Sequence, residues 1–266
     1  MNVFAFDIET IPDVAAGKQL LGMHDIDDAD VARAMFHIRR QQTGHSEFLQ
    51  LHLHKVVAIS VAMRSRDSFR VWSLGDPDSD EAELIRRFFD GIDRYTPQLV
   101  SWNGSGFDLP VLHYRMLVHG ISAPRYWESG DNDRDFRFNN YLSRYHSRHL
   151  DLMDVLAGYQ PRAAAPLDQT AVLCGLPGKL GMDGGKVWGC YLAGEIEAIR
   201  DYCESDALNT FLLYLRFEKL RGNLTSEEYE KECAVIREVL REQDLPHLNE
   251  FLDAWKNAGS KQTASD

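Results

Sequence analysis

The sequence predicts an α/β fold in which α-helices pack around a mixed central β-sheet. Period-two strand patterns come first along the chain, helical and strand patterns then alternate, and only helical patterns follow towards the C-terminus. The chain has 266 residues, of which 44% are hydrophobic and 26% are charged. This length and composition are typical of one globular domain with helical additions. Because strands come first, strands and helices then alternate, and helices come last, we expect the sheet at the centre of the fold with the helices around it.

The first strand is the clearest element of the predicted sheet. Residues 3–9 alternate between two faces, so that Asp7 and Glu9 leave the strand on the same side as Val3 and Ala5. A short polar turn joins the next two strand patterns and predicts a β-hairpin. The remaining strands are expected at residues 55–64, 68–74 and 98–102.

Helical patterns fill most of the remaining chain. Helices are expected at residues 27–42, 80–94, 108–119, 150–156, 167–173, 195–221, 226–242 and 248–255. An irregular surface excursion is expected at residues 122–148, and a glycine-rich loop at residues 175–189.

These elements predict a main domain over residues 1–220 with a helical insertion at residues 13–52. A C-terminal helical extension is expected at residues 221–257. Residues 258–266 are small and polar, and we expect them to form a disordered tail.

Composition restricts the class of protein. A net charge of −12 argues against a passive nucleic-acid coat, which carries a basic face. An enzyme that acts on nucleic acid stays possible, because bound cations neutralise clustered carboxylates.

The four cysteines lie far apart without a C-x-x-C pair, which favours a reducing cytoplasm over a disulfide framework. The N-terminus lacks the pattern of a signal peptide, and no apolar run approaches the ~18 residues of a membrane span.

Two acids on the first strand form the first candidate site element. Asp7 and Glu9 project from one otherwise apolar face, where like charges repel each other and lose hydration. A divalent cation relieves both costs, and carboxylate oxygens suit Mg²⁺ or Mn²⁺. The alternative is that both acids lie in water at the end of the strand.

A glycine turn followed by an acid forms the second element. The segment from Asn103 to Asp108 leads from a strand through Gly104 and Gly106 into a helix. The alternative is that Asp108 only caps this helix, a common role of aspartate.

The third element lies inside the long helix expected at residues 195–221. Tyr202 and Asp206 are four residues apart and therefore share one helix face, the one with the apolar stripe that packs on the sheet. An aspartate on such a stripe is costly unless it is paired or binds a metal. The neighbouring Asp201 and Glu204 are expected on a solvated face. The alternative for Tyr202 is a core aromatic whose hydroxyl reaches the edge of the core.

In this order the three elements resemble the exonuclease motifs of the DEDD superfamily. The matching segments are Phe6-Asp7-Ile8-Glu9-Thr10, Asn103-Gly104-x-x-Phe107-Asp108 and Tyr202-x-x-x-Asp206. The tyrosine is typical of the subtype that includes the proofreading domains of family B DNA polymerases, whereas the histidine subtype keeps histidine where this chain has Asp201.

Further stretches are similar to a stand-alone bacterial group that is related to those proofreading domains. They are residues 149–154, the loop at 175–179 and residues 202–206. The resemblance covers roughly residues 1–220 and implies a ribonuclease H-like fold with the first strand at its centre.

The resemblance also implies a 3′→5′ exonuclease that uses two divalent cations, Mg²⁺ or Mn²⁺. It assigns Asp7, Glu9 and Asp206 to the first metal, and Asp7 with Asp108 to the second. Paired metals clamp the attacking and the leaving oxygen in phosphoryl displacement. Tyr202 is expected to orient the attacking water rather than act as a base, since the ordinary pKa of tyrosine is ~10. The product is a nucleoside 5′-monophosphate.

Several alternatives remain open at this stage. The leading hypothesis is action on the 3′ end of single-stranded DNA, and the second is an exoribonuclease or oligonucleotide-trimming enzyme, because no contact to a 2′-hydroxyl is identifiable. An inactive nucleic-acid-binding adaptor would have no chemical need for all five residues. A metal-dependent nucleotide phosphohydrolase is disfavoured by the spacing of Tyr202. Oligomeric state stays open.

Five residues are candidates for substrate contacts. Phe107 and Trp102 are candidates for base stacking, against a role in the core. Asn103 either contacts the terminal nucleotide or fixes the turn. Lys179 and Lys186, in the glycine-rich loop, are candidates for phosphate neutralisation, against an ordinary surface role. Two further acids, Asp151 and Asp154, are expected to be structural, with Asp151 the supporting residue.

Overall fold

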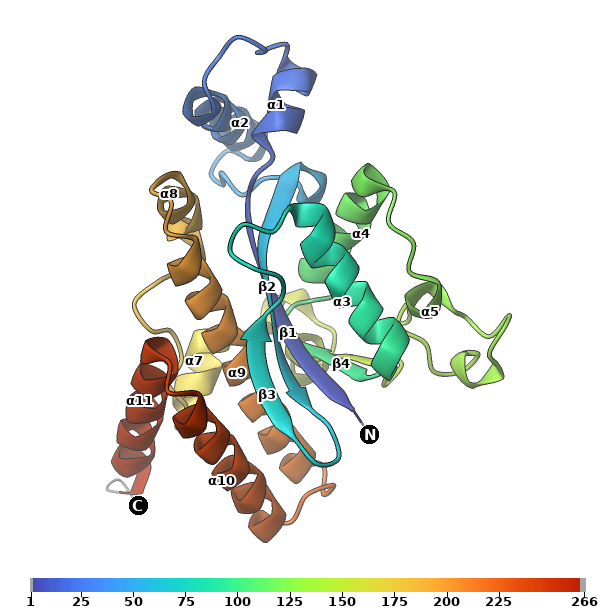
Figure 1. Ribbon diagram of the computed structural model, residues 1–266, viewed down its shortest axis with the longest axis vertical. Coiled ribbons are helices and arrows are strands. Elements are labelled where there is room, and N and C mark those ends of the chain that lie inside the picture. The colour runs from blue at the N-terminus through green and yellow to red at the C-terminus, as the bar shows by residue number, and fades with distance from the viewer. Residues whose placement is uncertain (1, 264–266) are drawn as a thin grey trace.

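The computed structural model describes residues 2–263 of the chain, and side chains as far as residue 258. A five-stranded sheet in the order β3-β2-β1-β4-β5 forms its centre (Figure 1). The strands are β1 (Val3–Pro12), β2 (His54–Arg64), β3 (Phe69–Ser73), β4 (Gln98–Ser101) and β5 (His149–Asp151).

The sheet is mixed, with β1 in the middle. β1 pairs antiparallel with β2 and parallel with β4, while β2 pairs antiparallel with β3 and β4 parallel with β5. This confirms the predicted mixed sheet and the β2–β3 hairpin, and it is the α/β arrangement expected of a ribonuclease H-like fold. The central strand β1 therefore lies between layers of helices.

Helices cover both faces of the sheet. The helices of the main body are α3 (Glu81–Tyr95), α4 (Asp108–His119), α5 (Pro124–Trp127), α6 (Leu152–Leu156), α7 (Leu167–Leu173), α8 (Val187–Leu192), α9 (Ile196–Leu220), α10 (Ser226–Gln243) and α11 (Pro246–Thr263). Phe4, Phe6 and Ile8 of β1 join the core under α3 and α4. Val3 and Ala5, on the opposite face, join the core with α9 (Figure 1). The alternation of β1 therefore directs Asp7 and Glu9 towards α9.

The insertion between β1 and β2 holds two helices, α1 (Val14–Leu21) and α2 (Asp28–Thr43). Both project away from the sheet at the end where β1 finishes (Figure 1). Val31, Met35 and Leu49 form their small separate core. The pattern predicts α2 but misses α1, whose start depends on the Asp13 side chain, which accepts a hydrogen bond from the Ala16 amide at 3.0 Å.

The structure corrects the expected helix at residues 150–156. Residues His149–Asp151 form the edge strand β5, and only Leu152–Leu156 are helical. A strand of three residues is too short to show a period, and Asp151 starts the helix by accepting a hydrogen bond from the Asp154 amide. The expected loop at 175–189 likewise ends early, because α8 begins at Val187.

Two expectations about the surface also change. Residues 122–148 hold little regular structure, as expected, but Tyr126, Phe136 and Tyr141 are buried in the core beside α3. Helix α11 runs to Thr263, so residues 258–263 are helical rather than a disordered tail, and residues 264–266 lie outside the described part. No proline occurs after Pro246 to stop that helix.

The C-terminal helices share the core of the main body. Tyr229, Ile236 and Leu240 of α10, and Phe251 and Trp255 of α11, belong to the same buried cluster as Ala5 and the α9 residues. No helix in the described part of the chain is long and apolar enough to cross a membrane.

Candidate active site

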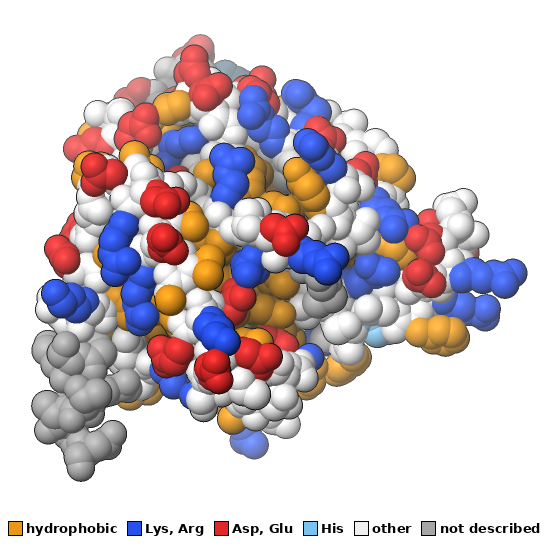
Figure 2. All heavy atoms as spheres, turned by 60° about the horizontal axis from the view of Figure 1, so that its bottom comes forward, with side chains coloured by type: hydrophobic (Ala, Val, Ile, Leu, Met, Phe, Trp, Pro, Cys, Tyr) orange, Lys and Arg blue, Asp and Glu red, His pale blue; other side chains and the backbone are white. Residues whose placement is uncertain are grey.

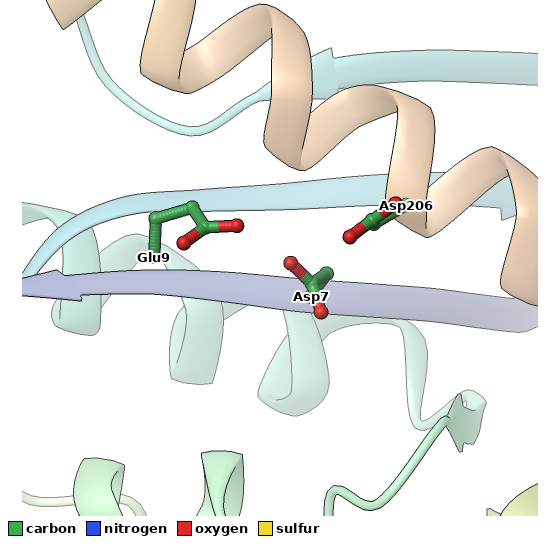
Figure 3. Close-up of side chains that lie close together, drawn as sticks. All are labelled: Asp7, Glu9 and Asp206. Atoms are coloured by element: carbon green, nitrogen blue, oxygen red, sulfur yellow. The ribbon is translucent and has the colours of Figure 1, made fainter. Parts of the chain in front are cut away.

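Three carboxylates meet between β1 and α9. Asp7, Glu9 and Asp206 each offer an oxygen atom, and these oxygens lie within 4.8 Å of one another. Figure 3 shows the Asp7 and Glu9 side chains rising from the same side of β1 towards Asp206 on the helix above. The alternative of a solvated strand end is wrong, because Glu9 is buried and Asp7 is only partly exposed.

Helix α9 places Asp206 and Tyr202 on its buried side. It packs along β1 and β2, and its residues from Tyr202 to Leu215 are all buried. The Tyr202 hydroxyl, one helical turn before Asp206, lies close enough to the Asp206 carboxylate for each group to shift the pKa of the other. The face predicted from the four-residue spacing is therefore the face that meets the acids of β1.

Asp108 is tied directly to β1. It is the first residue of α4, its side chain is buried, and its carboxylate lies close enough to the Ile8 amide for that amide to lower the pKa of Asp108. Ile8 lies between the two acids of β1, which brings the Asp108 charge close enough to raise the pKa of both. The N-cap of α4 is Phe107, so the alternative that Asp108 is merely a cap is wrong.

Burial raises the pKa of all four acids, and repulsion from other acids adds to the increase. Removal from water is the largest cause in each case, and it raises the pKa of Asp108 to about 7 and of Asp206 to about 6. Asp7 and Glu9 have pKa values well above the ordinary range, because burial adds to repulsion from the other acids. Burial beside these acids also raises the pKa of the Tyr202 hydroxyl far above its ordinary value.

Lys179 is the basic side chain that the structure brings to these acids. It is exposed, and its charge lowers the pKa of Glu9 and Asp206. The loop that carries it is anchored to α9 by Asn209, whose amide donates to the Gly178 carbonyl at 2.9 Å and accepts from the Gly178 amide at 3.3 Å. Spacing patterns do not predict that Asn209 anchors this loop. The signal in the sequence is an asparagine three residues after Asp206, in the apolar part of the same helix.

Asp151 organises the turn that precedes Asp108. Its carboxylate accepts hydrogen bonds from the amides of Asn103 and Ser105, both at 2.9 Å. Asn103 has a left-handed backbone with φ of 66°, and its carbonyl accepts from the amides of Gly106 and Phe107. The supporting role expected for Asp151 is confirmed, and the Asn103 backbone fixes the turn.

The remaining substrate candidates lie in different surroundings. Phe107 contacts the rings of Phe48 and His54 beside the acids. Trp102 donates from Nε1 to the Ala165 carbonyl at 3.0 Å and packs at the edge of the core. Lys186 bonds the Gly181 carbonyl and pairs with Asp183.

Glu204 corrects the expectation of a solvated face on α9. Its side chain is buried and accepts hydrogen bonds from the amide and hydroxyl of Ser73, at 2.7 and 2.8 Å. His247 of α11 contacts its other oxygen at 2.9 Å. Glu204 thus has protein partners throughout, which distinguishes it from Asp206.

The four site acids are chemically suited to divalent cations. Among the side chains that the structure describes, no lysine, arginine or histidine lies within ion-pair distance of Asp7, Glu9, Asp108 or Asp206. Four carboxylates that are buried or only partly exposed, and that have no salt bridge among the described side chains, are unstable as anions unless positive charge is supplied. Clustered carboxylate oxygens are the preferred ligands of Mg²⁺ and Mn²⁺. The donor set therefore fits hard divalent metals.

The fold and this site define an exonuclease-like phosphodiester hydrolase of the ribonuclease H-like class. Residues 46–255 match a family described as a predicted 3′-5′ exonuclease related to the exonuclease domain of PolB. The match covers well over half of the chain, and the protein belongs to this family. Asp108, Tyr202 and Asp206 lie within the match, whereas Asp7 and Glu9 precede it. The structure joins the two parts, because β1 pairs with β2 and β4 of the matched region.

Proposed function

We propose that this 3′→5′ exonuclease removes nucleoside 5′-monophosphates from the 3′ end of single-stranded DNA, with two Mg²⁺ or Mn²⁺ ions held by Asp7, Glu9, Asp108 and Asp206. The observation that carries the proposal is the meeting of three carboxylates within 4.8 Å, without a salt bridge among the described side chains, beside the Tyr202 hydroxyl. When bound, the metals would supply positive charge that activates water and stabilises the leaving oxygen.

The site residues have different roles in the proposed reaction. Asp7, Glu9 and Asp206 would bind metal between β1 and α9, and Asp108 adds a fourth carboxylate from α4. Tyr202 stays protonated at neutral pH because its pKa is raised. Its hydroxyl can donate to Asp206 and accept a hydrogen bond from the attacking water, which fits a role in orientation rather than as a base.

Lys179 supports the assignment to a polyanionic substrate. Figure 2 shows Lys and Arg side chains interspersed with Asp and Glu over one face of this acidic protein, so that this face carries no large patch of only positive or only negative charge. We therefore propose weak, local binding of phosphates, in which Lys179 neutralises one phosphate near Asp206.

The four cysteines are free thiols, which supports a reducing location such as the cytoplasm.

The test is an end-labelled degradation assay. The purified protein is incubated with 5′-labelled single-stranded DNA and RNA in Mg²⁺ or Mn²⁺, beside the variants Asp7→Ala and Asp206→Asn. We expect stepwise shortening from the 3′ end and release of 5′-monophosphates by the wild type, with at least ~100-fold slower hydrolysis by either variant. Chelation of the metal should stop the reaction.

Glu197→Gln is the matched control, because Glu197 is an exposed acid at the start of the same helix as Asp206. It should keep wild-type activity. Degradation of RNA but not of DNA would replace the proposed substrate by RNA. A folded wild type that shortens neither polymer in either metal would refute the proposed function.

A further inference from the structure

Two exposed aromatic rings, those of Phe48 and Tyr114, lie where residues 46–54 pack against α4. Phe48, in the segment that follows α2, is 57% exposed and packs on Phe107, with ring centroids 5.5 Å apart. Tyr114 is 46% exposed and packs edge-on against His52 at 5.9 Å. With His54, which contacts both Phe48 and Phe107, these residues form an aromatic row between residues 46–54 and α4.

One end of the aromatic row lies at the candidate active site. Phe107 immediately precedes Asp108, and the ring of His54 bonds the hydroxyl of Thr10, the neighbour of Glu9, at 2.9 Å. Phe107 and Tyr114 are seven residues apart, so they share one side of α4 about 10 Å apart along its axis. The row therefore leads away from the acids along the helix surface.

The insertion holds the outer ring in place. The Phe48 carbonyl accepts a hydrogen bond from Nε of Arg39 on α2 at 2.8 Å. The next residue, Leu49, is buried in the core of the insertion, and its carbonyl contacts Nε2 of His54 at 3.3 Å. A large apolar side chain that is fixed by its backbone yet open to water is suited to stacking, because little conformational entropy is lost when a base covers it.

We infer that the aromatic row carries the substrate strand upstream of the scissile nucleotide, with unpaired bases stacking on Phe48 and Tyr114. The inference rests on the proposed function and names the surface that would select single strands. Every nucleobase has a face that stacks on an aromatic ring, so the row accepts any sequence, whereas paired bases in a duplex are not free to stack there. The helical insertion then acts as a part of the substrate site.

The alternative path is a hollow of about 610 Å³ on the other flank of α4, lined by Pro110, His113 and the 45%-exposed Trp127. Its ring contacts are internal to the protein, since His113 bonds the Tyr126 hydroxyl and packs on Trp127. The two paths make opposite predictions for Phe48→Ala and Trp127→Ala.

The first experiment measures binding without hydrolysis. A fluorescein-labelled oligothymidylate of about ten nucleotides is titrated with Asp206→Asn protein in Ca²⁺, and anisotropy gives Kd. Adding Phe48→Ala should weaken binding about ten-fold, and Phe48→Trp should restore it. The matched control is Phe138→Ala, which removes another exposed ring and should leave Kd unchanged.

The second experiment measures turnover by the wild type and the Phe48 variants. Phe48→Ala should raise KM for the same oligonucleotide about ten-fold while kcat changes less, and KM for a dinucleotide should change less than two-fold, about the limit of such a measurement. An unchanged Kd and KM in Phe48→Ala, or a loss only in Trp127→Ala, would overturn the inference. A wild type that does not hydrolyse the substrate refutes the proposed function, while the binding measurement still decides the path.

Discussion

At the scale of single residues, Tyr202 separates the binding of metal from the orientation of water. Its side chain lies beside the acids, and its hydroxyl is close enough to interact with the Asp206 carboxylate. We expect Tyr202→Phe to lower kcat about 10- to 100-fold while the variant still binds Mn²⁺, because all four carboxylates remain. The measurements are steady-state kinetics and calorimetric titration of Mn²⁺. Loss of Mn²⁺ binding in this variant would show that the hydroxyl has a structural role instead.

The raised pKa values of Asp108 and Asp206 predict how metal-free protein responds to pH. Both carboxyls hold protons more tightly in the folded protein than at the ordinary value of 3.8, with folded-state pKa values of about 7 and about 6. The stability that this protonation contributes is present below pH 3.8 and is lost as pH rises through about 6 and then about 7. Metal binds the deprotonated carboxylates, so its stabilising effect should grow over the same range.

Thermal unfolding checks this prediction. In a chelator, Tm should fall between about pH 5 and about pH 8, and added Mn²⁺ should raise Tm most at the upper end. Asp206→Asn should remove the part of the fall near pH 6. A metal-free Tm that rises over this interval would contradict the pKa shifts.

At the scale of elements, the loop before α8 depends on α9 for its position. Asn209 is fully buried and forms both of its bonds with the backbone of Gly178, next to Lys179. We expect Asn209→Ala to destabilise the protein by about 1–3 kcal/mol, because two buried backbone groups lose their partners. KM for DNA should rise because Lys179 is no longer held near Asp206.

A double-mutant cycle tests the connection between Asn209 and Lys179. If Asn209 acts on the substrate through Lys179, Lys179→Ala should raise KM in the wild type but add little in the Asn209→Ala background. Fully additive effects on KM would mean that the two residues act independently. Thermal unfolding reports the loss of stability separately.

Sequence patterns predict elements whose periodicity is long enough to be seen. β1 alternates over several residues, and Tyr202 and Asp206 are one helical turn apart on α9. The shared face of Asp7 and Glu9 and the shared face of Tyr202 and Asp206 therefore follow from spacing alone. The strand β5 is not predicted, because three residues are too few to show a period. The contact between Phe48 and Phe107 is not predicted either, because it depends on how the insertion folds back and not on any local pattern.

At the scale of the whole molecule, topology converts separated acids into one site. β1 lies between β2 and β4, so α4 after β4 and α9 across the sheet both reach it. Spacing along the chain does not predict the 4.8 Å separation of the three carboxylates, since that separation is set by the packing of α9 on β1. Asp108 is identified by the resemblance to known motifs and not by spacing, because its position beside the Ile8 amide is a tertiary contact.

The C-terminal helices share one buried core with the helix that carries Tyr202 and Asp206. The α9 residue Phe211 packs on Phe69 of β3, in the cluster that also contains Ile236 and Leu240 of α10. A chain that ends at Leu220 leaves this side of α9 open to water. Each large apolar side chain that loses its cover forfeits about 1.5–3 kcal/mol, and several such losses are comparable with a total stability of about 5–15 kcal/mol.

We therefore expect the chain ending at Leu220 to unfold at a much lower temperature than the full chain, or to bind a hydrophobic dye without a cooperative transition. Leu240→Ala in the full chain is a less disruptive variant that tests the same contact. Because Leu240 is fully buried, this substitution should lower the free energy of unfolding by about 2–5 kcal/mol, measured by chemical unfolding. Activity should fall with the folded fraction, since α9 carries Tyr202 and Asp206. A shortened chain with the Tm and the kcat of the full protein would show that α10 and α11 are a separate addition to the domain.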